Sequence, residues 1–170
     1  MTQAELVAAF EAHRNAVYRF AWRMSGPAAA EDVTQDVFLT VLKQPDRFDA
    51  RRGSLRAFLL GIARNVALKR WRDEHRWESL DDEDHLEVMP LAIDGREVAD
   101  LVATAVRSLP PLQREAIILA EYEELSLEEI ARAVEAEVGT VKSRLHRARE
   151  RLRRMLAPLA SAHHHAGSRR

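Results

Sequence analysis

The sequence predicts an all-α protein of two small helical domains joined by an acidic linker, and three observations lead to this fold class. Apolar residues recur at helical spacing along most of the 170 residues, and no useful length of chain alternates apolar and polar residues as a β-strand does. A central acidic segment that contains Pro90 has no periodicity. Near the C-terminus, a short helical segment, a tight break and a basic helical segment are typical of a helix-turn-helix.

The first domain is expected to span residues 1–78 and to hold three helices. Thr2 and Glu5 have capping-box spacing, and Ser25-Gly26-Pro27 ends the helix that they begin. A second helix ends at Gln44-Pro45, and Ser54 can cap a third. The apolar positions expected to face the core from the second and third helices are Val33, Val37, Val41, Leu42, Leu55, Phe58, Leu59, Ile62 and Val66.

The second domain is expected over residues 95–158, after an acidic interdomain linker at 79–94. It begins with an amphipathic helix that Pro110-Pro111 ends, followed by a helix from Leu112 to about Glu123. A capping box at Ser126 and Glu129 begins a short helix, and a longer one follows after a four-residue break. Residues 159–170 are expected to form a disordered tail.

Composition limits the function classes that need to be considered. Hydrophobic residues make up 46% and charged residues 31% of the chain, as in a soluble folded protein. The absence of cysteine excludes disulfides, thiol catalysis and Cys-ligated zinc. No apolar run approaches the roughly 18 residues of a membrane span, and no secretion signal is evident, so we expect a cytoplasmic protein. His163-His164-His165 lie in an Ala/Gly/Ser-rich end, and we expect neither a metal site nor another cofactor.

The small net charge of -1 hides a strong segregation of charge along the chain. Residues 64–77 carry five basic and two acidic side chains, whereas residues 78–100 carry one basic and nine acidic ones. The pattern repeats, with seven acids and one base in 121–137 and seven bases and one acid in 138–156. Two basic helices, each beside an acidic stretch, predict two polyanion contacts in one molecule.

The second basic helix has the character of a DNA-recognition helix. The major groove admits one helix, whose first turns reach base edges while flanking basic residues meet phosphates. An arginine-rich helix end in solvent is the alternative. The basic side chains of this helix are Lys142, Arg144, Arg147, Arg149, Arg151, Arg153 and Arg154.

Four motifs together resemble the extracytoplasmic function (ECF) sigma factors of bacterial RNA polymerase, members of the sigma-70 family. The C-terminal motif is Leu125-Ser126-Leu127-Glu128-Glu129-Ile130-Ala131 with Val138-Gly139-Thr140-Val141-Lys142-Ser143-Arg144-Leu145 and Arg147-Ala148-Arg149. Upstream of it lie Leu109-Pro110-Pro111-Leu112-Gln113-Arg114-Glu115, Ala30-Glu31-Asp32-Val33-Thr34-Gln35-Asp36-Val37-Phe38 and Ala57-Phe58-Leu59-Leu60-Gly61-Ile62-Ala63-Arg64-Asn65. The motifs occur in the family's order and cover nearly the whole chain.

The resemblance implies a non-catalytic subunit that binds core RNA polymerase and promoter DNA. The N-terminal domain would dock on the polymerase clamp and melt and capture the -10 element, and the C-terminal domain would read the -35 element. The residues implied in clamp binding are Asp32, Gln35, Asp36 and Phe38. Without the family, acids on a solvated helix face would explain them equally well.

The resemblance also implies the DNA contacts of both domains. Asn65 would hold an unstacked base of the non-template strand, and neighbouring cations would neutralise the phosphates of that strand. Trp71 and Trp77 could stack on bases or simply pack. Implied contacts at the -10 element are Asn65, Lys69, Arg70, Trp71 and Arg72. At the -35 element, Thr140, Ser143, Arg144 and Arg147 would lie near bases, and Lys142 and Arg149 nearer phosphates.

Two residues depart from the family pattern. Glu135 stands where the family often has Gly in the turn between the two helices, which matters if the backbone there needs a positive φ. Lys69 stands where a carboxylate is frequent, so the -10 preference cannot be transferred from better-known relatives.

The acidic linker resembles the family's interdomain segment, which threads through the polymerase cleft, although a plain solvated tether would explain it nearly as well.

Control of the chain is expected to come from outside it, through an anti-sigma factor that could hold it at the membrane. No small-molecule substrate is expected.

A helix-turn-helix regulator that binds an operator without polymerase would explain the C-terminal part, but it leaves the motifs at 31–38 and 57–65 without a role. An enzyme is disfavoured because Asp32 and Asp36 lack an accompanying Glu-x-x-His and no nucleophile motif or phosphate-binding glycine loop occurs.

Overall fold

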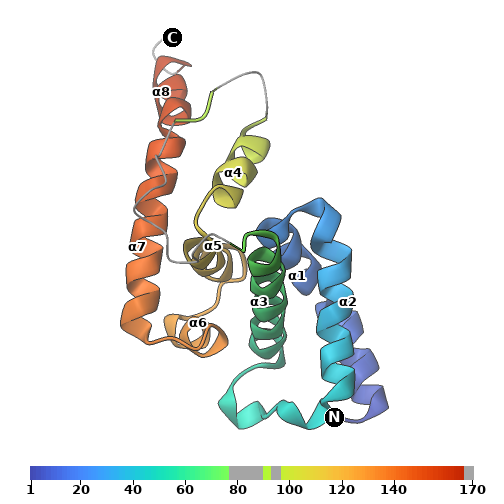
Figure 1. Ribbon diagram of the computed structural model, residues 1–170. Helices are drawn as coiled ribbons and strands as arrows, with labels where there is room; N and C mark the ends of the chain where they lie inside the picture. The colour runs from blue at the N-terminus through green and yellow to red at the C-terminus, as the bar shows by residue number, and fades with distance from the viewer. Residues whose placement is uncertain (77–89, 93–96, 167–170) are drawn as a thin grey trace.

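The computed structural model describes residues 1–76, 90–92 and 97–166, with residues 162–166 described by their backbone alone (Figure 1). Every regular element within these ranges is a helix, which confirms the predicted fold class. Most of the predicted acidic linker, together with Trp77, lies outside the described residues. None of the described helices is long and apolar enough to cross a membrane.

The N-terminal half, residues 1–76, contains α1 (Gln3–Ser25), α2 (Pro27–Lys43) and α3 (Leu55–Glu74). The predicted capping box at Thr2 is formed, since its hydroxyl accepts from the Glu5 amide while Glu5 accepts from the Thr2 amide. Gly26 turns the chain between α1 and α2 with a φ of +87°, a conformation that favours glycine. Short 3₁₀ turns at Pro45–Arg47 and Ala50–Arg52 connect α2 to α3.

One predicted core position in this half is wrong. Val33, Val37 and Val41 are buried, but the side chain of Leu42 is 57% exposed. The first three are four residues apart and share one face of α2, whereas Leu42 is rotated by about 100° from Val41. Leu42 therefore belongs to the surface of the molecule.

The C-terminal half begins with α4 (Val98–Arg107), α5 (Pro111–Ile117) and a π-helical continuation, η3 (Ile118–Tyr122). It continues with α6 (Leu127–Ala133) and α7 (Val138–Met155), the two helices of the predicted helix-turn-helix. A further helix, α8 (Ala157–Ala166), covers much of the segment for which a disordered tail was predicted. The backbone of 157–166 corrects that expectation, and 167–170 lie outside the described residues.

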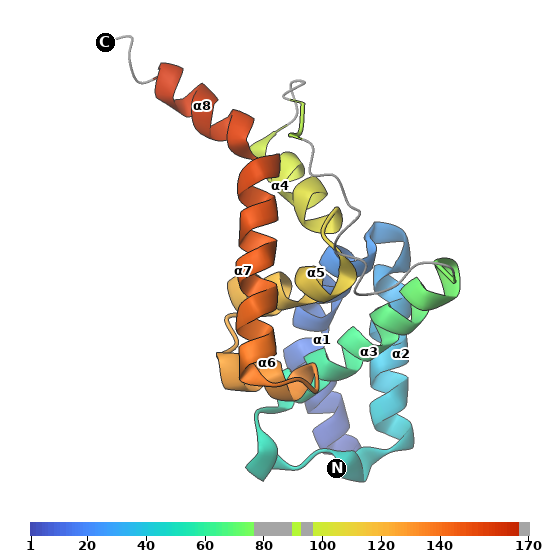
Figure 2. The same cartoon turned by 60° about the vertical axis from the view of Figure 1, so that its left-hand side comes forward.

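The two halves pack against each other. Helix α3 lies against α6, and α1 lies against α4, α5 and η3 (Figures 1 and 2). One continuous cluster of buried apolar side chains includes Phe20 and Leu60 from the N-terminal half and Leu109 and Ile130 from the C-terminal half. The described residues therefore form one packed body, with motifs from both halves along a common boundary.

Candidate nucleic-acid interface

The helix-turn-helix is built on a small apolar core between α6 and α7. Ile130, Val134 and Val141 are buried in it, and the capping box at Ser126 is formed. Glu135 in the turn has a φ of +54°, so the backbone does require the left-handed conformation for which glycine is usual. The turn is therefore retained in this chain, with a non-glycine residue in a disfavoured conformation.

The predicted -35 residues all lie on α7, but they do not have the same surroundings. Thr140, Lys142, Ser143, Arg147 and Arg149 are exposed on this helix. Arg149 forms an ion pair of 2.7 Å with Glu121. The Arg144 side chain is only 17% exposed and lies 3.6 Å from Glu115. The predicted base reader Arg144 is therefore the member of this set that is drawn into the body of the protein.

The predicted -10 residues lie along α3. Asn65, Lys69 and Arg72 are exposed, whereas Trp71 is partly buried and stacks on His75 with 4.5 Å between ring centroids. Arg70 lies 3.7 Å from Asp32 and 3.6 Å from Asp36, which are two of the predicted clamp residues on α2. The exposed residues Asn65, Lys69 and Arg72 are three or four positions apart and therefore share one side of α3, while Arg70 links this helix to α2.

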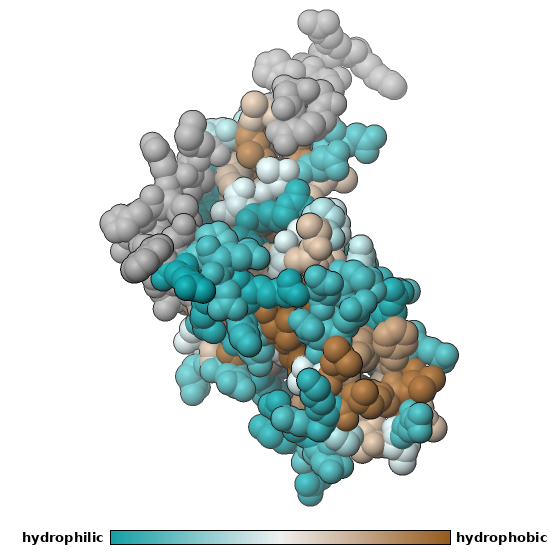
Figure 3. Space-filling model, turned by 45° about the vertical axis from the view of Figure 1, so that its right-hand side comes forward, coloured by the Kyte–Doolittle hydropathy of each residue, from teal (hydrophilic) through white to brown (hydrophobic). Residues whose placement is uncertain are grey.

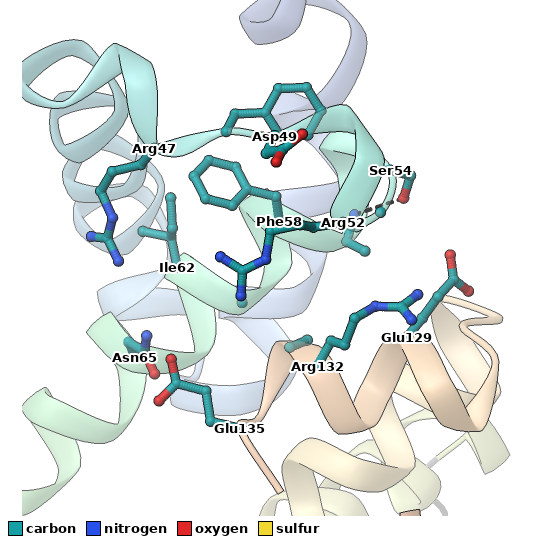
Figure 4. A pocket seen from close by; sticks show the side chains of 15 residues that line it. Arg47, Asp49, Arg52, Ser54, Phe58, Ile62, Asn65, Glu129, Arg132 and Glu135 are labelled. Carbon is teal, nitrogen blue, oxygen red and sulfur yellow. Dashed lines mark hydrogen bonds between the residues drawn. The ribbon is translucent and has the colours of Figure 1, made fainter.

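Asn65 also lines a cavity of about 190 Å³ between the two halves (Figure 4). Phe48, Phe58 and Ile62 supply apolar lining from the N-terminal half. The opposite wall comes from α6 and the following turn, and Figure 4 shows Glu135 of that turn next to Asn65. The lining residues whose side chains carry a charge are Arg47, Asp49, Arg52, Glu129, Arg132 and Glu135.

The predicted clamp residues Asp32, Gln35 and Asp36 are exposed on α2, but Phe38 is not. Phe38 is 8% exposed and packs edge-to-face on Phe10, with 4.8 Å between the ring centroids. It therefore supports this surface from beneath.

Sequence reasoning missed an apolar patch beside these residues. It consists of the exposed side chains of Val7, Phe10, Leu39 and Leu42, at the end of the molecule where α1 begins and α2 ends (Figure 3). The signal was present in the sequence, because Leu39 and Leu42 fall outside the four-residue spacing of the buried valines in α2. Exposed apolar patches of this kind mark interaction sites.

A buried acidic residue, Glu115 of α5, was also missed as a functional candidate. Its carboxylate is fully buried and accepts from Nε and Nη2 of Arg64 at 2.7 and 3.1 Å. Burial raises the pKa of Glu115, while the hydrogen bonds and charge of Arg64 and the charges of Arg144 and Arg72 act against this rise. A charged residue beside the apolar run Ala116–Leu119 was the available signal.

A partly buried cation, Arg114 of α5, donates from Nη1 to the carbonyl oxygen of Met24 in the N-terminal half at 2.6 Å. Burial lowers its pKa to about 10, and the charge of Arg107 contributes to the change. Within the described residues, no group of His, Asp and Glu side chains comes together in a way that could hold a metal ion.

Comparisons with known proteins agree with this arrangement. Residues 9–77 match the family Sigma-70 region 2, and residues 99–152 match Sigma-70, region 4. The chain is 39% identical over 158 residues to the ECF RNA polymerase sigma factor SigE of Mycolicibacterium smegmatis, in an alignment that covers 88% of this chain and 60% of SigE. It is 32% identical over 162 residues to the ECF sigma factor SigW of Bacillus subtilis, covering 86% of each chain.

Two solved structures share the fold. The sigma factor RpoE of Bartonella quintana, solved in complex with the anti-sigma factor NepR, has a TM-score of 0.69 and 30% identity, covering 91% of this chain and 96% of that one. CnrH, solved in complex with the cytosolic domain of CnrY, has a TM-score of 0.65 and 26% identity, covering 95% and 90%. With both family regions present in order, the chain belongs to the ECF sigma factors of the sigma-70 family, which are non-catalytic subunits of RNA polymerase.

Proposed function

We propose that this chain binds core RNA polymerase through α2, recognises a -10 element with α3 and a -35 element with α7, and promotes DNA melting and the initiation of transcription. The observation that carries the proposal is that one small chain combines an exposed acidic and apolar face on α2 with two separate helices of exposed basic and amide side chains. Binding an operator alone would give the face on α2 no role.

The polymerase contact is assigned to Asp32, Gln35 and Asp36 together with the apolar patch. Carboxylates and an amide offer acceptors to the basic and polar groups of a partner, while Leu39 and Leu42 can lose their solvent-exposed area on binding. An apolar centre beside a charged rim is the usual anatomy of a protein interface. Phe38 acts through its packing on Phe10, which fixes one side of the patch.

The -10 contact is assigned to Asn65, Lys69, Arg70, Trp71 and Arg72 on α3. The cavity beside Asn65 combines two aromatic rings with an amide, which suits an unstacked base that must be both stacked and read along its edge. Lys69 and Arg72 are exposed further along α3, where they can neutralise the phosphates of the same strand.

The -35 contact is assigned to α7. Thr140, Ser143 and Arg147 follow at spacings of three and four residues, and Arg144 is next to Ser143. These four side chains would lie near bases, while Lys142 and Arg149 would contact phosphates. The domains proposed for these tasks are residues 1–78 and 95–158, with 79–94 as the linker between them.

An anti-sigma factor is the proposed inhibitor, because the structurally similar sigma factor RpoE was solved in complex with the anti-sigma factor NepR. A partner that covered the clamp-binding and DNA-binding faces together would compete with core polymerase by mass action. We place the chain in the cytoplasm, held at the membrane only where its inhibitor is anchored there.

Co-elution of the purified chain with bacterial core RNA polymerase, followed by run-off transcription from a genomic library, tests this function. We expect a stable complex and promoter-specific transcripts. A chain that binds DNA but neither binds core nor yields transcripts would instead be an operator-binding regulator.

A further inference from the structure

The side-chain amide of Asn65 is held in one orientation by the residue before it. Nη1 of Arg64 donates a hydrogen bond to Oδ1 of Asn65 at 3.1 Å. Because a guanidinium has donors but no acceptor, an amide beside it must present its oxygen and not its nitrogen. The two N–H groups of the Asn65 amide are therefore left for another partner.

These N–H groups belong to the wall of the cavity assigned to the -10 base. Phe58, Ile62 and Asn65 line this cavity at spacings of four and three residues, which places them on one side of α3. Figure 4 shows the nitrogen of the Asn65 amide on the side of Ile62. The rings of Phe48 and Phe58, with 5.5 Å between their centroids, line the same cavity. A base that stacks on these rings would meet Asn65 along its edge.

Arg64 is itself held in place. Its side chain is only 14% exposed, and its Nε and Nη2 donate to Glu115 at 2.7 and 3.1 Å. These two contacts leave Nη1 for Asn65. Because the hydrogen bond to Asn65 joins neighbouring residues of one helix, it can form without Glu115. Arg64 therefore has the surroundings of a residue that acts through Asn65.

The orientation of an amide decides which bases it can read. An asparagine that is free to turn can exchange its oxygen for its nitrogen, so it can pair with an acceptor or with a donor on a base edge. An asparagine whose oxygen is bound by Arg64 offers donors. Guanine O6 and thymine O4 are exocyclic acceptors, whereas adenine and cytosine carry an exocyclic amine at the corresponding positions.

We propose that Arg64 is a positioning residue for -10 recognition, which directs the N–H donors of Asn65 toward the captured base and so selects guanine or thymine over adenine or cytosine. The proposal rests on the function proposed above and adds to it a rule of base choice. The preference should be about fivefold, the size of one neutral hydrogen bond. Arg64 need not touch DNA to exert it.

Transcription from a promoter library tests this proposal. The -10 element of a promoter that the wild-type chain uses is randomised, and each template carries a barcode in its transcribed part, so that sequencing of run-off transcripts reports the base at every position. Because all templates compete in one reaction, the base ratio does not depend on how much of a variant is folded. The wild-type chain should prefer guanine or thymine at one position, and Asn65→Ala should abolish the preference there.

Two variants of the pair should change this preference in different ways. Arg64→Ala should remove it, because the freed amide of Asn65 can turn. Asn65→Asp should reverse it toward adenine or cytosine, because one carboxylate oxygen accepts from Arg64 and the other faces the base as an acceptor. Asn65 is exposed, so the second variant should fold like the wild-type chain and keeps the test valid if Arg64→Ala folds poorly.

Glu115→Gln is the matched control for a merely structural role of Arg64. It weakens the contact of Arg64 with α5 and leaves the hydrogen bond to Asn65 in place, so the base ratio should stay at the wild-type value. Equal relaxation in Arg64→Ala and Glu115→Gln would overturn the positioning role. So would an unchanged ratio in Arg64→Ala, or a wild-type preference for adenine or cytosine at the position that Asn65→Ala affects.

Failure of the proposed function gives different results. If Asn65→Ala changes the base ratio at no position, the assignment of Asn65 to the -10 element is what fails, and the positioning role fails with it. If the wild-type chain yields no transcripts with core polymerase from any template, the proposed function itself is wrong.

Discussion

The surface assigned to polymerase and the residues assigned to DNA differ in how closely they are already paired with other residues of the same chain. Gln35, Leu39 and Leu42 are exposed on α2, where Asp32 and Asp36 form ion pairs of 3.7 and 3.6 Å with Arg70. On the DNA side, Arg144 is bound to a buried acid and Arg149 is paired with Glu121. The comparison indicates an order of events, in which polymerase can be bound before the promoter is read.

The largest effect on polymerase binding is expected from reversing a charge on α2. Asp36→Arg removes an acceptor and places a cation beside Arg70, so we expect at least about a tenfold loss of affinity for core polymerase, or about 1.4 kcal/mol. Fluorescence anisotropy with labelled chain measures this. Asp100→Arg on α4 is the control for a surface charge reversal, and both variants should change stability by only about 0.5 kcal/mol. Unchanged affinity for core would remove the α2 assignment.

On the DNA side, variants of α7 should separate readers from phosphate contacts. Arg144→Ala and Arg147→Ala should each cost about 1–3 kcal/mol in a base-specific manner, whereas Arg149→Ala should mainly reduce the salt slope by about one unit. Binding of promoter variants by the holoenzyme across a salt series measures both quantities. Identical changes in salt slope for all three, without any loss of discrimination, would make α7 a phosphate-binding helix.

The apolar patch provides a sharper test of the polymerase side. Leu39→Ser and Leu42→Ser should each weaken core binding by about 1 kcal/mol, since burial of half of a leucine side chain contributes about that much. Val98→Ser on α4 replaces an equally exposed apolar residue in the other half and should leave core binding unchanged. If all three variants bind alike, the patch serves another partner.

The turn of the helix-turn-helix should tolerate glycine better than its own residue. Glu135→Gly relieves a left-handed conformation that costs a non-glycine residue about 1–2 kcal/mol, part of which is lost to the greater freedom of glycine in the unfolded chain. We expect a gain of about 1 kcal/mol, or about 2–4 °C in Tm for a chain of this size. Thermal unfolding measured by circular dichroism decides, and a lower Tm would show that the Glu135 side chain contributes more than its conformation costs.

The smallest effect concerns how the stability of the protein depends on pH through Glu115. Because burial raises the pKa of Glu115 above its ordinary value of 4.5, its contribution to stability is complete below that pH and declines as pH rises through the raised pKa. The Tm of the wild-type chain should therefore fall relative to Glu115→Gln as pH increases above 4.5. Parallel Tm curves for the two chains would contradict the raised pKa.

Local signals in the sequence predicted the helices well. The capping boxes at Thr2 and Ser126 and the cap at Ser54 each begin a helix where expected, because a side chain that satisfies backbone amides acts within three residues. The positive φ at Glu135 is likewise a local property, because it belongs to the turn between α6 and α7 where the family often has glycine. The π-helical turn at Ile118–Tyr122 had no comparable signal.

Features that depend on distant parts of the chain were not predictable. Arg64 and Glu115 are separated by 51 residues, and nothing in either segment specifies the other as its partner. The exposure of Leu42 likewise depends on which face of α2 the other helices cover. The candidate DNA-binding residues were found from the family's motifs. That Arg144 and Arg149 form ion pairs with Glu115 and Glu121 of the same chain could be seen only in the packed structure.

The last turn of α1 ends on a hydrogen-bond donor from a distant part of the chain. Nη1 of Arg114 donates to the carbonyl oxygen of Met24 at 2.6 Å, while Arg23 lies 4.0 Å from the ring centroid of Tyr122. Carbonyls at a helix end have no partner within the helix, so loss of the Arg114 contact would leave the Met24 carbonyl to water and weaken the corner at Gly26 from which α2 begins. The orientation of α2, the helix proposed to bind polymerase, therefore depends on Arg114, and loss of this contact should speed amide hydrogen exchange around Gly26.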